Sequence, residues 1–179
     1  MSRDLRSSPY NERVAECREA ARCLGATGDP PVLREITLEE FRRRRRVLPP
    51  LLAMRADHVL SENKRVRGAM TALQQGDLVS LGRLVTASGR SMVTLFGAGT
   101  PETSLLLALL DRTPAVLGVT LAGAGFGGNL LVLAKPGSMG AIAQAVAGPF
   151  SVRFGEAADR LAFRVVETGP AARIEAVVG

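Results

Sequence analysis

The sequence predicts an α+β fold in which a mainly helical first part, residues 1–113, precedes a ferredoxin-like antiparallel α/β sandwich in residues 114–179. Three observations support this prediction. Apolar residues recur at spacings of three and four through the first part, which is the period of an amphipathic helix. Two short apolar runs, 116–121 and 130–134, flank a glycine-rich loop, as strands joined by a turn do. After residue 100, helix-like and strand-like segments alternate.

Length and composition restrict the class of protein. A chain of 179 residues with 46% apolar and 22% charged residues can bury the core of a globular domain. It has neither an apolar run long enough to span a membrane nor a signal-peptide pattern, so we expect a cytoplasmic protein with no membrane partner. Cys17 and Cys23 diverge on a helix, so neither a disulfide nor a metal site is expected from them.

The net charge of +6 comes almost entirely from arginine, and residues 42–46 are five arginines in succession. Successive side chains on a helix point about 100° apart, so these arginines do not form one stripe that could follow a phosphate backbone. With one Tyr and no Trp, the chain has few aromatic side chains for base stacking. We therefore expect a solvated helix here and no nucleic-acid partner.

The first two helices carry clear start and stop signals. Pro9 suits the first helical position and Gly25 a left-handed end. After a short extended piece at 32–36, Thr37 and Glu40 form a capping box that opens the second helix. The first helix is predicted to bury its apolar face and to show its charged side to water. The apolar face is Tyr10, Val14, Cys17, Ala21 and Leu24, and the charged side is Arg13, Glu16, Arg18, Glu19 and Arg22.

A third helix, which follows a proline pair and ends near Gln75, and a fourth are expected to form an antiparallel hairpin, since only Gly76 and Asp77 connect them. Asp77 is a favourable N-cap. His58, the only histidine, has no second His or Cys in reach, so we expect a structural role rather than a metal site. The predicted seams are Leu52, Ala56, Val59, Asn63, Val66, Met70 and Leu73 on the third helix, and Leu78, Leu81, Val85, Ser88 and Met92 on the fourth.

The second part is predicted to alternate helices and strands. In order, we expect a loop at 94–100, a helix at 101–112, strands at 116–121 and 130–134, a short helix at 141–147, and late strands at 161–166 and 173–178.

The loop between the first two strands has the pattern GxGxxG. A dinucleotide-binding turn of this pattern requires a helix directly after the glycines and an acidic residue about 20 positions later, and the chain has neither. Two interpretations remain open from the residues alone: a tight hairpin with a buried corner, or a loop that faces a phosphate. The loop residues are Gly123, Ala124, Gly125, Phe126, Gly127 and Gly128.

An ordered set of short motifs resembles the C-terminal half of galactokinases, which are members of the GHMP small-molecule kinase family. The resemblance extends from about residue 4 to about residue 150. The motifs are SPYNER at 8–13, LRE at 33–35, RADHVLSENKRVR at 55–67, QGDL at 75–78, SM at 91–92, TPE at 100–102 and the glycine loop at 123–128.

The resemblance implies that residues 1–179 form a GHMP kinase C-terminal domain. The family transfers the γ-phosphate of ATP, with Mg²⁺, to the C1 hydroxyl of galactose. By the same resemblance, the glycine loop lines the phosphate side of the active-site cleft, and Tyr10 and Asn11 belong to the substrate-binding side, where Tyr10 contacts the sugar. The expected ligands are therefore galactose or a related sugar, and ATP and Mg²⁺ in the completed enzyme.

The resemblance also implies that the chain is incomplete as a kinase. Galactokinases carry the catalytic aspartate, its arginine partner and the serine-rich phosphate loop in their N-terminal half, and none of these motifs occurs here. We therefore expect no catalytic residue and no metal ligand in this chain, and an active site only with an N-terminal half as partner. Without that half, the exposed interface should favour self-association.

Within the resembling half, some residues depart from the family's pattern. Gly89 and Arg90 precede Ser91, and Leu121 and Ala122 precede the glycines at a place where galactokinases usually have a hydroxyl. These departures support an alternative function, a non-catalytic sugar- or nucleotide-binding or regulatory module.

Overall fold

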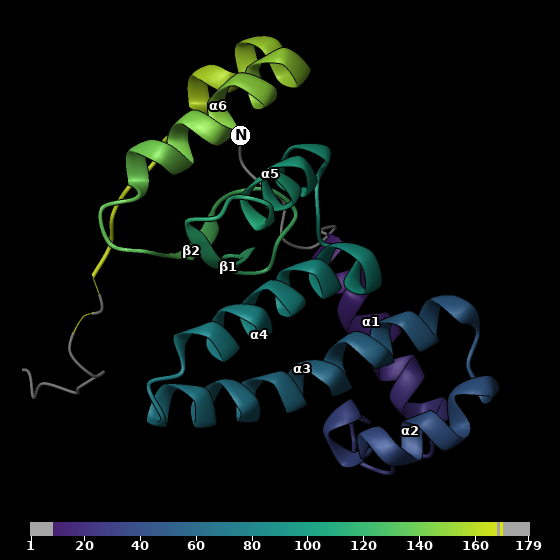
Figure 1. The fold of residues 1–179 in the computed structure, drawn as a ribbon. Coiled ribbons are helices and arrows are strands. Elements are labelled where there is room, and N and C mark those ends of the chain that lie inside the picture. The colour runs from purple at the N-terminus through teal and green to yellow at the C-terminus, as the bar shows by residue number, and fades with distance from the viewer. Residues whose placement is uncertain (1–8, 168, 170–179) are drawn as a thin grey trace, which may run out of the picture.

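The computed structural model describes residues 9–167 and residue 169. Within them, the α-helices and β-strands follow in the order α1 Pro9–Cys23, α2 Leu38–Arg44, α3 Pro50–Gln74, α4 Leu78–Ser91, α5 Pro101–Asp111, β1 Val116–Leu121, β2 Leu130–Ala134 and α6 Met139–Phe154. Helices α3 and α4 lie side by side, the sheet and α5 lie beyond α4, and α6 lies on the far side of α5 (Figure 1). The α+β class expected from the sequence is confirmed.

The first hydrophobic core lies between α1, α2 and α3, and Leu24 and Phe41 are its largest fully buried side chains. The capping box at the start of α2 is confirmed, because Thr37 Oγ1 accepts the Glu40 N–H at 3.1 Å and the Glu40 carboxylate accepts the Thr37 N–H at 2.8 Å. The extended piece expected at 32–36 is wrong. A 3₁₀ turn forms there instead, and the Glu35 carboxylate within it accepts backbone N–H groups from Thr27, Gly28 and Val32.

The hairpin of α3 and α4 is confirmed (Figure 1). Gly76 has a φ of +67°, and Asp77 Oδ1 accepts the Ser80 N–H at 2.9 Å, as an N-cap does. The predicted seam of α3 is wrong in its C-terminal half, where its apolar members are more than half exposed. These residues are Val66, Met70 and Leu73.

The buried face of α4 consists of small residues and packs on β1. Gly82, Thr86 and Gly89 are buried there, whereas Leu78, which the sequence placed in the seam, is 49% exposed. A Cβ added to Gly82 would lie 2.0 Å from the carbonyl oxygen of Leu117, so only glycine permits this approach. The Thr86 hydroxyl accepts the backbone N–H of Val119 at 3.2 Å.

A second hydrophobic core lies between the sheet, α5 and α6. Strands β1 and β2 pair antiparallel, with Val119 opposite Val132, and Val119 and Val146 are fully buried. Helix α6 is longer than the 141–147 expected from the sequence. It continues past Pro149 to Phe154 because the ring of Phe150 is buried and contacts that of Phe154, with centroids 4.9 Å apart.

The segment after α6 does not pair with the sheet. A strand was expected at 161–166, but the structure has none there. Leu161 and Phe163 pack on the second core through their side chains, whereas Val165 and Val166 are more than two thirds exposed. The other late strand, expected at 173–178, lies outside the described residues.

Candidate functional site

The glycine loop is the connection of a β-hairpin. It joins β1 to β2, and the Ala122 N–H donates to the Asn129 carbonyl at 2.9 Å across its base. The loop residues with positive φ are Gly123 (+74°), Gly125 (+80°), Phe126 (+59°), Gly127 (+104°) and Gly128 (+95°). Such a run of left-handed backbone explains why glycines are concentrated here.

One corner of the glycine loop rests on the buried residue Ala98, while its two ends are open. The Phe126 N–H donates to the Ala98 carbonyl at 2.5 Å, and a Cβ on Gly125 would lie 2.6 Å from that oxygen. Cβ atoms added to Gly123 and Gly128 would meet nothing within 4 Å. The loop thus has a packed corner and an unobstructed backbone surface, so the structure combines features of both interpretations left open above.

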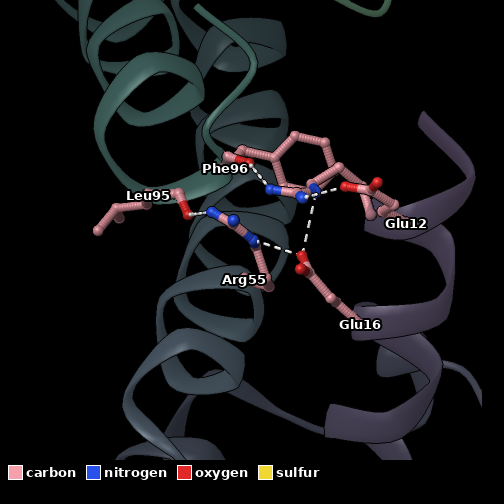
Figure 2. A network of polar contacts seen from close by, with 6 residues as sticks. Glu12, Glu16, Arg55, Leu95 and Phe96 are labelled. Carbon is pink, nitrogen blue, oxygen red and sulfur yellow. Dashed lines mark hydrogen bonds and ion pairs between the residues drawn. The ribbon is translucent and has the colours of Figure 1, made fainter. Parts of the chain in front are cut away.

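The turn at residues 95–98, which ends at Ala98 under the glycine loop, is held by two arginines, and Figure 2 shows the contacts around it. Arg55 on α3 donates from Nε to Glu16 on α1 at 2.7 Å and from Nη1 to the Leu95 carbonyl at 2.5 Å. Arg13 on α1 lies 3.0 Å from the same Glu16 carboxylate and donates to the Phe96 carbonyl at 3.4 Å. These contacts bring the first half of α1, Arg55 on α3 and the turn at residues 95–98 into one region.

Tyr10 lies on the first turn of α1, at the wall of a groove of about 500 Å³. The side chain is 50% exposed, so its hydroxyl can reach a ligand. Asn11 is the next residue of α1 and is also exposed. The groove lies between α1, α3, the segment 30–34 and the turn after α4, and its lining includes Arg13, Val14, Cys17, Val59 and Phe96.

His58 is a buried structural residue on α3, as expected from the sequence. Its Nδ1 lies 2.8 Å from the Ser91 hydroxyl, and its ring contacts that of Phe96 with centroids 4.6 Å apart. Burial lowers the pKa of His58 to about 4, so the imidazole is neutral at pH 7. It helps to hold the Met92–Phe96 segment, a π-helix that continues α4.

Sequence reasoning missed the arginine network. Arg13 and Glu16 were assigned to the side of α1 that faces water, but their side chains are only 12% and 19% exposed. Arg55 is buried although it is charged, and it occupies a position beside the apolar seam of α3. A signal was present, since Arg13 and Glu16 are three positions apart and can pair on a helix. Their partner on α3 could not be found from spacing.

Other expectations concern metals, charge and membranes. Across residues 9–167 and 169, no three His, Cys, Asp or Glu side chains gather closely enough to hold a metal ion. Cys17 and Cys23 are free thiols. The arginines at 42–46 are exposed, in agreement with a solvated helix. In the described part of the chain, every helix is too short or too polar to cross a membrane.

Sequence comparisons identify relatives of this chain. Residues 69–152, which include the glycine loop but not Tyr10, match the family described as GHMP kinases C terminal. The galactokinase of Thermotoga neapolitana is 37% identical over 151 residues, which are 84% of this chain and 41% of that protein. The galactokinase of Enterococcus faecalis is 37% identical over 158 residues, 88% of this chain and 41% of that protein. The chain thus spans about two fifths of the length of these relatives.

A solved structure has the same fold. The crystal structure of Lactococcus lactis galactokinase complexed with galactose superposes with a TM-score of 0.77 at 32% sequence identity. The match covers 87% of this chain and 40% of that chain. Both the sequence and the fold therefore correspond to the C-terminal part of a larger protein.

Proposed function

Because this chain carries the C-terminal domain of the GHMP kinase family and matches the C-terminal part of galactokinases, we propose that it forms one wall of a galactokinase-type active site. That site phosphorylates galactose, or a related sugar, at the C1 hydroxyl with ATP. The other wall, with the catalytic residues, belongs to an N-terminal half, so the chain alone is inactive. We place the completed enzyme in the cytoplasm.

The observation that carries this proposal is the position of the glycine loop. The loop rests on Ala98, and the segment leading to Ala98 is bonded through Arg13 to α1, which carries Tyr10 on its first turn. A sugar-side tyrosine and a phosphate-side loop are thereby supported by one turn. Phosphoryl transfer depends mainly on such positioning of donor and acceptor, since the protein takes little covalent part in the reaction.

The loop fits a phosphate on its open surface. At Gly123 and Gly128 no side chain covers the backbone, so an ATP phosphate could approach the main chain there. The described residues do not fit Mg²⁺ in the same way, because they contain no cluster of acidic ligands. We therefore assign no Mg²⁺ ligand to this chain and derive no step through the metal.

Complementation tests the proposal. The chain is co-expressed with the N-terminal half of the Thermotoga neapolitana galactokinase, and galactose-dependent ADP formation is measured for the mixture and for each part alone. Activity is expected only in the mixture. Robust sugar-dependent ATP turnover by the chain alone would show that the catalytic groups are not where we place them.

A specific observation favours the second candidate, a non-catalytic binding or regulatory module. Two residues that depart from the galactokinase pattern contact neighbouring elements here: Gly89 packs against the Val119 carbonyl of β1, and Arg90, whose side chain is 62% exposed, pairs with Asp111 at the end of α5. The contacts of these two residues are thus with β1 and α5. Galactose binding by the chain alone, measured by calorimetry, together with an inactive mixture would support this second function.

A further inference from the structure

The turn from Leu95 to Ala98 supports two separate parts of the proposed site. Its first carbonyl, that of Leu95, accepts from Arg55, and its last, that of Ala98, accepts the N–H of Phe126 in the glycine loop. Ala98 is fully buried, so the end of the turn cannot move without the loop. A displacement of this turn is therefore transmitted to the loop.

Arg55 determines where the turn lies. Its side chain is 7% exposed, and its guanidinium spans the gap between Glu16 on α1 and Leu95 with contacts of 2.7 and 2.5 Å (Figure 2). Gly97 lies against both arginines, since a Cβ added there would lie 3.2 Å from Arg55 Nη1 and 3.3 Å from Arg13 Nη1. Arg13 makes a weaker link, with a 3.4 Å hydrogen bond to Phe96.

We propose that Arg55 is a positioning residue that couples the first half of α1 to the glycine loop. It acts through Glu16 on one side and through the Leu95–Ala98 turn on the other. Its functional meaning rests on the proposed kinase function. In the completed enzyme, Arg55 fixes the sugar side of the site relative to the phosphate side.

The planar guanidinium is the feature that makes this coupling specific. It offers several N–H donors in fixed directions, so one group bonds to a carboxylate and a carbonyl at once. A lysine ammonium at the same place keeps the charge beside Glu16 but cannot reproduce that span. Arg55→Met removes both contacts and leaves Glu16 paired with Arg13, whose Nε is 3.0 Å away, so this partly buried carboxylate keeps a cation beside it.

Amide hydrogen exchange and NMR on the chain itself test the proposal. The Phe126 amide reports on the loop, the ring signals of Tyr10, the only tyrosine, report on α1, and the Val119 amide reports on the sheet. Arg55→Met should speed exchange at Phe126 by about tenfold or more, with little change at Val119, and should shift the Tyr10 signals.

Arg65→Met is the matched control. It removes an ion pair with Glu62, at 2.8 Å, from the same helix, and its side chain is 16% exposed. It should leave both Phe126 and the Tyr10 signals unchanged. Arg55→Lys should behave as Arg55→Met does at both reporters while its melting temperature stays close to that of the unmodified chain, and it decides the test if Arg55→Met does not fold.

Three results would overturn the coupling: equal acceleration at Phe126 and Val119, no change at Phe126, or a change at Phe126 without a change at Tyr10. The measurement uses the chain alone and requires no catalysis. The inference about Arg55 and the proposal of kinase function can therefore fail independently of one another.

Discussion

Acidification should weaken the fold through His58, whose pKa burial lowers from 6.5 to about 4. Between these values the unfolded chain binds a proton at His58 that the folded chain does not bind. The free energy of unfolding therefore falls as the pH falls through this window, and the stability lost is fully present above pH 6.5. The difference between the two pKa values corresponds to about 3 kcal/mol, most of which is lost by pH 4.5.

Urea unfolding followed by circular dichroism at pH 7 and pH 4.5 measures this loss. His58→Gln is the control, because its amide can still hydrogen-bond to Ser91 but does not titrate. The variant should lose much less stability between the two pH values than the unmodified chain. Since His58 is the only histidine, its pKa can also be read directly from NMR of the ring. A pKa of 6 or higher in the folded chain, or equal losses in both proteins, would refute the reasoning.

Two further predictions concern backbone features. Gly125→Ala should lower the melting temperature more than Gly123→Ala: both incur about 1 kcal/mol for a side chain at positive φ, but only the Cβ at 125 would lie within 2.6 Å of Ala98. Equal melting temperatures would show that the loop does not rest on Ala98. Asp77→Ala should cost about 1 kcal/mol in urea unfolding because the Ser80 N–H loses its acceptor, whereas Asp77→Asn, which keeps an acceptor oxygen, should cost less. An alanine variant as stable as the asparagine variant would contradict the cap.

Elements with local signals could be predicted from the sequence. The capping box at Thr37, the stop at Gly76 and the N-cap at Asp77 depend on residues within one turn of each other, so the sequence contains the whole interaction. The glycine hairpin between 116–121 and 130–134 belongs to the same class. The resemblance to galactokinases came from the order of the motifs, and the comparisons support it.

Features that depend on distant residues could not be predicted in this way. The seam of α4 was chosen by apolarity, but its buried face is formed by Gly82, Thr86 and Gly89, which contribute no hydrophobic pattern. Their spacing of four and three was a usable signal for a close approach. Arg55 gave no signal, because its burial depends on a carboxylate 39 positions away and on a carbonyl 40 positions away. The assignments of Tyr10, Asn11 and the loop to ligands remain predictions.

The contact between α4 and β1 also decides from which side the sheet can accept another strand. The Thr86 hydroxyl occupies the N–H of Val119, and the helix backbone at Gly82 and Gly89 closes off the carbonyls of Leu117 and Val119. An added strand therefore cannot form backbone hydrogen bonds along this edge of β1. Any added strand, whatever its source, must therefore align with β2, the other strand of this two-stranded sheet within the described residues. Recruitment of a strand by this sheet is one-sided, which limits how another protein chain or a second copy can extend it.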